Sequence, residues 1–120
     1  MSSQDALAVT RAYHDAWTTK DFAAAAALLA DALVVEVPIN SYPTSESFAA
    51  ALASFGSMVS KVDLLAAMSD ANQAMLLYDL HAEGLGSLRV AEHFTVDDGK
   101  ITRIRQIHDT AAVRAAGLGG

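Results

Sequence analysis

The chain has 120 residues, of which 52% are hydrophobic and 18% are charged, and it contains no cysteine. This length and composition predict a single globular domain, residues 1–120, and exclude disulfides and thiolate chemistry. The formal net charge of −6 argues against nucleic-acid and membrane partners, since anionic surfaces attract clustered lysines and arginines. The first residues lack the basic and apolar segments of a secretory signal, and no apolar run approaches the roughly 20 residues of a membrane span, so we expect a cytoplasmic protein.

The hydrophobic pattern indicates helices in the first half of the chain and strands in the second. Apolar residues recur at helical spacing near the start, whereas from Val59 onward they alternate with polar residues as in half-buried strands. Asp21 is expected to cap the second helix, and Pro38 to end the first strand. The expected elements are helices at 3–18, 21–30 and 45–55, strands at 33–37, 59–68, 74–83, 88–96 and 101–109, and a frayed tail with a helical turn at 111–120.

Helices followed by a run of strands predict an α+β fold, with one curved antiparallel sheet wrapped around the N-terminal helices. Strands of about ten residues are long for a domain of this size, so we expect a strongly twisted and curled sheet. A curled sheet closed by helices leaves a conical interior. Small-molecule pockets form at the mouths of such interiors.

One carboxylate, Glu92, interrupts an otherwise apolar strand face, and the register of the last hairpin decides where it points. A two-residue type I′ turn at Asp98-Gly99 places Glu92 opposite Arg105, in a surface salt bridge. A type I turn followed by a left-handed Gly99 places it opposite Ile104. We favour the second register because it gathers the basic residues on the outer face. The side chains that then point into the cone are Glu92, Gln106 and His108.

Two segments, "AYHDAWTTKDFAAAAALLADALVVEVP" and "AEHFTVDDGKITRIRQIHD", resemble the nuclear transport factor 2-like superfamily, specifically its SnoaL-like polyketide cyclase branch. The resemblance spans nearly the whole chain and implies a cone-shaped, cystatin-like α+β barrel. It says little about the reaction, because the same fold hosts ketosteroid isomerases, epoxide hydrolases, dehydratases, cyclases and proteins without chemistry.

The resemblance also assigns roles to particular positions. In ketosteroid isomerases a tyrosine on the first helix and a protonated carboxylic acid hydrogen-bond the developing enolate oxygen, and these positions fall on Tyr13 and Glu92. The general base of the isomerases falls on Val37, which cannot abstract a proton, so a standard ketosteroid isomerase is excluded. The catalytic aspartate of epoxide hydrolases falls on Gln106. A structural polar network around Glu92 is the alternative to a catalytic role.

Four ionisable residues are candidates for the missing base: Glu36, Asp79, His81 and His108. Amphipathicity of the strand around Asp79 would expose it with His81, whereas the resemblance places Asp79 toward the cavity. An inward Asp79 would leave Leu76, Tyr78 and Leu80 as an apolar stripe outside the sheet. Such a stripe predicts a homodimer formed through the outer sheet face.

We therefore expect a small-molecule-binding protein, acting as a cofactor-independent acid–base enzyme of the isomerase, cyclase or dehydratase type. Its substrate would be a small, mostly apolar carbonyl or hydroxylated compound. The alternative is a non-catalytic ligand-binding or accessory dimer. No phosphate loop, flavin signature or metal-ligand spacing indicates a cofactor or metal. The expected catalytic residues are Tyr13, Glu92, Asp79 and His81, and the expected substrate-binding residues are Trp17, Glu36, Val37, Phe94, Ile104, Gln106 and His108.

Overall fold

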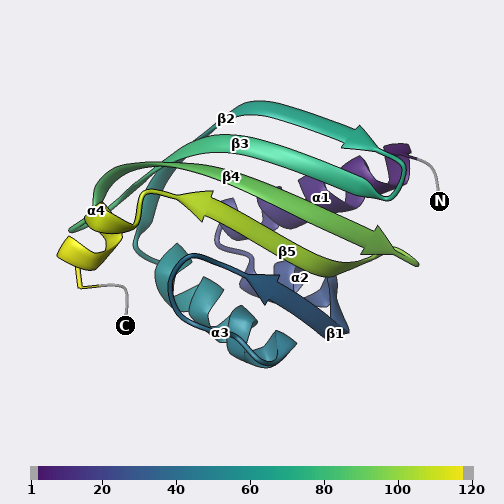
Figure 1. The fold of residues 1–120 in the computed structure, drawn as a ribbon, viewed down its shortest axis with the longest axis horizontal. Coiled ribbons are helices and arrows are strands. Elements are labelled where there is room, and N and C mark those ends of the chain that lie inside the picture. Colours follow the sequence, from purple (N-terminus) through teal and green to yellow (C-terminus); the bar gives the residue numbers. More distant parts are fainter. Residues whose placement is uncertain (1–2, 118–120) are drawn as a thin grey trace.

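The computed structural model of the protein describes residues 3–117 and shows the expected α+β fold (Figure 1). Five strands form one curved, unclosed sheet in the order β1-β5-β4-β3-β2, in which β1 runs parallel to β5 and all other pairs are antiparallel. The elements are α1 (Ser3–Thr18), α2 (Phe22–Ala27), β1 (Leu29–Glu36), α3 (Ser45–Gly56), β2 (Val59–Asp70), β3 (Gln73–Ala82), β4 (Gly86–Asp97), β5 (Lys100–His108) and α4 (Thr110–Ala115).

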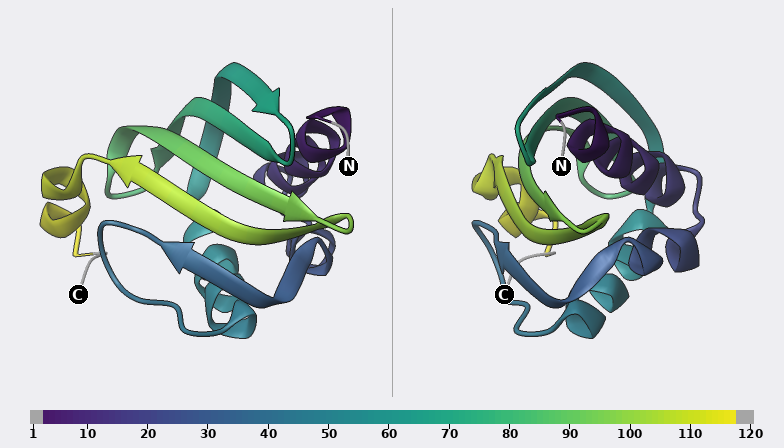
Figure 2. Two further views of the ribbon diagram at one scale, coloured as in Figure 1. Left: turned by 45° about the vertical axis from the view of Figure 1, so that its right-hand side comes forward. Right: turned by 90° about the vertical axis from the view of Figure 1, so that its right-hand side faces the viewer.

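The sheet curves around the N-terminal helix, as the long strands predict. Figure 2 shows β2, β3 and β4 arching over α1, with α3 beside β1 on the same side of the sheet. The core fills the space between them and contains large side chains that are almost fully buried. Each such apolar side chain stabilises the fold by about 1.5–3 kcal/mol. They include Tyr13, Trp17, Phe48, Leu76, Tyr78, Leu80, Phe94, Ile101 and Ile104.

The first strand begins earlier than expected. The alanine-rich helix ends at Ala27 instead of Ala30, where the N–H of Leu28 donates to the Ala25 carbonyl at 3.1 Å. The N–H of Ile101 then donates to the Leu28 carbonyl at 2.8 Å, and Leu29 pairs with Ile101 in the sheet. Tertiary pairing with β5 therefore overrides the high helix propensity of leucine and alanine at Leu29 and Ala30.

The β4–β5 hairpin follows neither expected register over its full length. Its turn has the two left-handed residues of a type I′ turn, Asp98 (φ 52°) and Gly99 (φ 76°). A register irregularity between Thr95 and Val96 then shifts the pairing, so that Glu92 lies opposite Gln106 instead of Ile104 or Arg105. Relative to the favoured register this is a shift of two residues, which keeps every side chain on its expected face.

The C-terminal helical turn is present as α4, and residues 118–120 of the expected tail lie outside the described residues. Asp109 caps α4 by accepting from the N–H of Ala111 at 2.9 Å. Within residues 3–117, no helix combines the length and apolar character that a membrane crossing requires.

Candidate functional site

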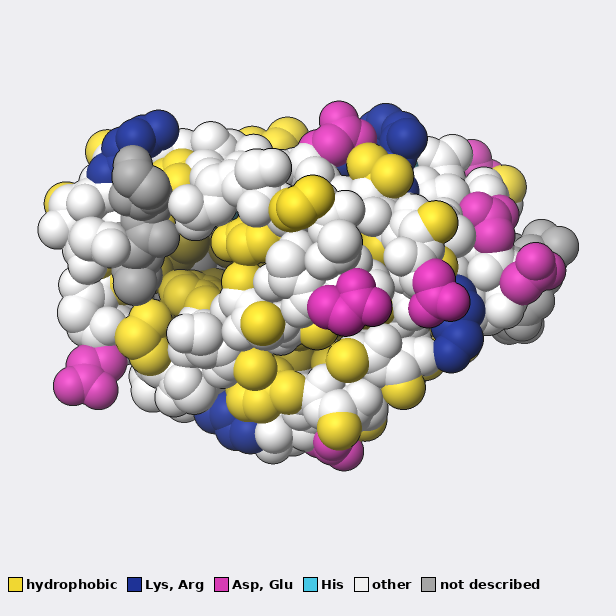
Figure 3. Space-filling view, turned by 90° about the horizontal axis from the view of Figure 1, so that it is seen from below, with side chains coloured by type: hydrophobic (Ala, Val, Ile, Leu, Met, Phe, Trp, Pro, Cys, Tyr) yellow, Lys and Arg dark blue, Asp and Glu magenta, His cyan; other side chains and the backbone are white. Residues whose placement is uncertain are grey.

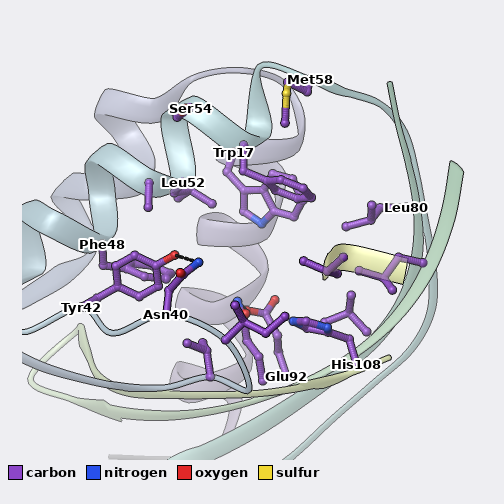
Figure 4. A pocket seen from close by; sticks show the side chains of 18 of the residues that line it. Trp17, Asn40, Tyr42, Phe48, Leu52, Ser54, Met58, Leu80, Glu92 and His108 are labelled. Carbon is purple, nitrogen blue, oxygen red and sulfur yellow. Dashed lines mark hydrogen bonds between the residues drawn. The ribbon is translucent and has the colours of Figure 1, made fainter. Parts of the chain in front are cut away.

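A cavity of about 290 Å³ opens between the inner face of the sheet, α1, α3 and the loop after β1 (Figure 3). The space-filling view shows a hollow with hydrophobic walls, and the close view shows side chains from the sheet, the helices and the loop converging on it (Figure 4). Most of the wall is apolar, and the polar groups are few, which is typical of small-molecule sites. The polar or ionisable residues that line it are Tyr13, Asn40, Tyr42, Ser54, Tyr78, Glu92, Gln106 and His108.

The carboxyl group of Glu92 lies in this wall and is only 1% exposed. The Tyr78 hydroxyl donates to Glu92 Oε1 at 2.7 Å, and the Gln106 amide Nε2 donates to Oε2, also at 2.7 Å. Burial raises the pKa of Glu92, because desolvation penalises the charged form. The hydrogen bonds from the two donors lower the pKa and only partly offset this increase. The structure thus pairs the carboxylate that interrupts the apolar stripe of β4 with two neighbouring donors.

Tyr13 lies against the same region from α1. Its ring makes an edge contact with Phe94, with centroids 5.7 Å apart, and its hydroxyl is buried without a hydrogen-bond partner among the described residues. Burial raises the pKa of Tyr13, and the nearby Glu92 raises it further. An unpaired buried hydroxyl is costly and calls for an explanation, and a ligand in the cavity that Tyr13 lines would supply its partner.

The sequence prediction missed the role of Tyr78 and the burial of His14. Tyr78 is inside the sheet and 3% exposed, and burial, followed by the charge of Glu92, raises its pKa. His14 is a polar residue type on α1, but it is 3% exposed and its ring lies 5.0 Å from that of Tyr78. Because the curled sheet covers a wide arc of α1, the polar side chain of His14 is buried.

His108 lines the cavity at the end of β5, as the hairpin prediction placed it. Its Nδ1 atom lies 3.2 Å from the carbonyl oxygen of Asp109. A carbonyl only accepts, so Nδ1 is the donor in this contact, and in the neutral imidazole with this tautomer Nε2 is the acceptor. Of the histidines considered as bases, His108 is the one that lines the cavity.

The loop after β1 supplies polar groups at the mouth of the cavity. The Asn40 amide donates to the Tyr42 hydroxyl at 3.5 Å, and both side chains point into the space shown in Figure 4. The Tyr42 ring packs edge-on against Phe48 of α3, with centroids 5.6 Å apart. Thr44 caps α3 through a reciprocal bond with Ser47, which fixes where this loop ends.

Asp79 and His81 do not face the cavity, and the expectation of an inward Asp79 is wrong. The alternation along β3 buries Leu76, Tyr78 and Leu80 instead. On the outer face Asp79 accepts from Arg89 at 2.7 and 2.9 Å, and this partner lowers the pKa of Asp79. His81 lies beside it, with Nδ1 2.8 Å from the Ser87 hydroxyl.

Three of the expected substrate-binding residues also lie elsewhere. Glu36 is on the outside, where Arg105 donates to it at 2.9 Å and lowers its pKa. Phe94 and Ile104 face inward but do not line the cavity; both are 0% exposed and belong to the core. The other four expected binding residues, Trp17, Val37, Gln106 and His108, do line the cavity. Within the described part of the chain, no group of three or more His, Asp or Glu side chains is placed to hold a metal ion.

The fold and the site define a class of small α+β protein in which a curved sheet and N-terminal helices enclose a cavity with a buried acid. The chain belongs to the SnoaL-like domain family, whose sequence profile matches residues 10–104. No curated protein sequence matches the chain.

Solved structures share this fold. A protein from Kribbella flavida DSM 17836 is 33% identical, with a TM-score of 0.86 and 92% of each chain covered. An epoxide hydrolase of Mycobacterium tuberculosis similar to limonene-epoxide hydrolase is 24% identical, with a TM-score of 0.77, covering 95% of this chain and 90% of that one. An NTF2-like protein of Cytophaga hutchinsonii is 18% identical, with a TM-score of 0.79, covering 88% and 91%. The NTF2-like fold expected from the sequence is confirmed.

Proposed function

We propose that the protein is a cofactor-independent acid–base enzyme of the isomerase, cyclase or dehydratase type, acting on a small, mostly apolar carbonyl or hydroxylated compound. The observation that carries this proposal is the Glu92 carboxyl group, which is 1% exposed and lines an apolar cavity beside the unpartnered hydroxyl of Tyr13. A structural neighbour that is an epoxide hydrolase agrees with small-molecule chemistry on this fold. A cytoplasmic location is part of the same proposal.

In this proposal Glu92 and Tyr13 stabilise an oxyanion. The raised pKa of Glu92 favours the neutral acid, whose O–H can donate to a ligand oxygen. Protonation is compatible with the bonds from Tyr78 and Gln106, because a carboxyl group has several lone-pair sites. The Tyr13 hydroxyl supplies the second donor. Donors aimed at a developing oxyanion typically contribute a factor of about 10²–10³ each.

His108 is the proposed base, in place of Asp79 and His81. Its Nε2 would remove a proton from the carbon next to the substrate carbonyl, while the carbonyl oxygen becomes the enolate oxygen held by Glu92 and Tyr13. In a β,γ-unsaturated ketone, return of that proton to the γ-carbon shifts the double bond and completes an isomerisation. Glu92 and His108 are diagonal neighbours on β4 and β5, since Glu92 pairs with Gln106, and Val90 with His108. Diagonal positions are about 7–8 Å apart, which leaves room for a reacting group between the side chains.

The test is exchange of α-protons of cyclic ketones in D₂O, followed by NMR. His108→Gln should lower the exchange rate by about 10²–10⁴, and Tyr13→Phe by about 10². His81→Gln is the matched control for His108→Gln, because it changes a histidine on the outer face. Glu36→Gln changes a carboxylate on the outer face. Both controls should leave the rate unchanged. Equal loss in His81→Gln and His108→Gln, or no exchange in the wild type, would overturn the proposal.

A ligand-binding protein without catalysis is the second candidate, and Val37 favours it. This residue lines the cavity at the position where ketosteroid isomerases carry their base, and it cannot move a proton. Saturable binding followed through the fluorescence of Trp17, without any α-proton exchange, is the result that this candidate predicts.

We also propose a homodimer through the outer face of the sheet, although not through the stripe first expected. Leu77, Ala91 and Ile107 form a row across β3, β4 and β5, because Leu77 pairs with Ala91 and Ala91 with Ile107. Ile107 is 71% exposed, and the paired residues Met68 and Met75 are 67% and 46% exposed. Exposed apolar groups in adjacent rows are typical of a protein interface.

A further inference from the structure

The size of the cavity limits what it can hold. A cavity of roughly 150 Å³ accommodates benzene, which has six heavy atoms. At about 290 Å³, the cavity of this protein is twice as large and corresponds to about 12 heavy atoms by the same scale. One ring, or two fused rings, fits this volume, and four fused rings do not.

The charges around the cavity exclude most ions. Among the described lining residues there is no lysine or arginine, and Glu92 is the one carboxylate. The nearest arginines on the strands, Arg89, Arg103 and Arg105, bond to carboxylates on the outer face. An anionic ligand would therefore enter beside a carboxyl group, with no lysine or arginine in the described lining to neutralise it, at a large desolvation cost.

The cavity also does not favour binding of a cationic ligand. Both oxygens of Glu92 already accept hydrogen bonds, from Tyr78 and Gln106, so an ammonium group would compete with donors of the fold. Complete burial disfavours its ionised form, which is the form that an ammonium group would require. The aromatic rings of Trp17 and Tyr42 instead offer contact area for an uncharged ring.

Two separate polar sites flank the apolar wall. The first is where Glu92 of β4 and Tyr13 of α1 line the cavity. The second is on the loop after β1, where Figure 4 shows Asn40 and Tyr42 turned toward the same space. The sites come from different elements, so one small ligand that touches both needs two hydrogen-bonding groups.

We propose that the cavity binds an uncharged molecule of one or two rings, about 10–13 heavy atoms in size, with two oxygens that hydrogen-bond. One oxygen forms hydrogen bonds with Glu92 and Tyr13, and the other forms a hydrogen bond with Tyr42 beside Asn40. Hydroxylated bicyclic ketones have this chemistry. This inference rests on the proposed function of the cavity as a substrate site and specifies the class of substrate.

The test is titration calorimetry with ligands matched in shape. The set contains 1-indanone and its hydroxy isomers as neutral probes, indane-carboxylate as the anion, 2-aminoindane as the cation, and a four-ring ketosteroid as the size control. We expect at least one hydroxyindanone to bind about tenfold more tightly than 1-indanone. The anion and the cation should bind at least about tenfold more weakly than 1-indanone, and the steroid should not bind.

Variants assign the two contacts. Tyr42→Phe should remove the advantage of the hydroxyl group while leaving 1-indanone unaffected, and Tyr13→Phe should weaken both compounds. Glu36→Gln, on the outer face, is the control and should change neither. Tighter binding of the carboxylate, the amine or the steroid than of the neutral two-ring compounds would overturn the proposal, as would an advantage of the hydroxyl group that survives Tyr42→Phe.

The same ligands separate this inference from the proposed function through α-proton exchange. Selective binding of neutral two-ring ketones without exchange supports the ligand class and overturns the enzyme. Exchange together with preferred binding of a charged or four-ring ligand supports the enzyme and overturns the ligand class. Failure of every compound to bind overturns both.

Discussion

The hydroxyl of Tyr78 donates to Glu92 Oε1 at 2.7 Å, and both side chains are almost completely buried, on paired strands of the sheet. Tyr13, on α1, is equally buried, but its hydroxyl has no hydrogen-bond partner in the described chain. Two tyrosines beside one carboxyl group thus have different positions in the polar network: the hydroxyl of one bonds to the acid, and the hydroxyl of the other has no partner in the described chain.

This difference predicts opposite behaviour of two conservative variants. Tyr78→Phe removes a donor from Glu92 and should lower the free energy of unfolding by about 1–3 kcal/mol. It should also raise the pKa of Glu92 further, because the Tyr78 bond lowers it. Tyr13→Phe removes a hydroxyl that bonds to nothing, so its stability should equal or exceed that of the wild type. Urea denaturation and NMR titration of Glu92 measure both effects; equal destabilisation by the two variants would contradict the assignment.

The raised pKa of Glu92 predicts a pH-dependent stability. The folded protein holds the Glu92 proton more tightly than the unfolded chain, so the contribution of Glu92 to stability is greatest below the ordinary value of 4.5 and is lost as pH rises from there through the folded pKa. Glu92→Gln should remove this decline, since the Gln106 amide can turn so that its oxygen accepts from the new side chain. Denaturation between pH 4 and 8 measures it.

Glu36→Gln is the matched control, with the opposite sign. Arg105 lowers the pKa of Glu36, so its contribution is present above the ordinary value and is lost as pH falls through the folded pKa. A decline in wild-type stability toward high pH that persists in Glu92→Gln would show that another group is responsible.

The sequence predicts well where alternation is regular and poorly where a second influence acts. The alternation of β4 and β5 placed Glu92, Gln106 and His108 on the inner face even though the register was wrong by two residues. The same alternation in β3 indicated an outward Asp79 and an inward Tyr78, and the error came from preferring the family pattern to amphipathicity.

Other features of the site carry no periodic signal. His14 is polar by residue type, and only the packing of α1 under the curled sheet shows that it is buried. Asn40 and Tyr42 lie in an irregular loop, whose path depends on where β1 and α3 are anchored. The early start of β1 depends on pairing with Ile101, more than 70 residues later, which no local propensity encodes.

His14 predicts a second pH dependence, at higher pH and of opposite direction. Burial lowers its pKa below the ordinary value of 6.5, so the stability that its neutral form permits is present above pH 6.5 and is lost as pH falls through the folded pKa. His14→Phe retains a ring between Trp17 and Tyr78, and removes the buried Nδ1 that has no partner in the described chain. It should abolish this loss and stabilise the protein by about 1 kcal/mol. The measurement is thermal unfolding at pH 5 and pH 7.5. If the difference in Tm between these two pH values is the same in His14→Phe as in the wild type, the prediction is contradicted.

The outer face of the sheet offers a last comparison, between an apolar and a charged group on the same strand. Met75 is 46% exposed on β3, and Asp79, on the same face of that strand, is bonded to Arg89. If this face forms the homodimer, Met75→Lys places a charge in the interface and should shift the protein from dimer to monomer in analytical ultracentrifugation at micromolar concentration. Asp79→Asn breaks an exposed ion pair that does not line the cavity, so it should leave ligand binding unchanged. A wild type that sediments as a monomer would overturn the proposed dimer. A loss of ligand binding in Asp79→Asn would contradict the second expectation, because a change on the outer face would then alter binding in the cavity.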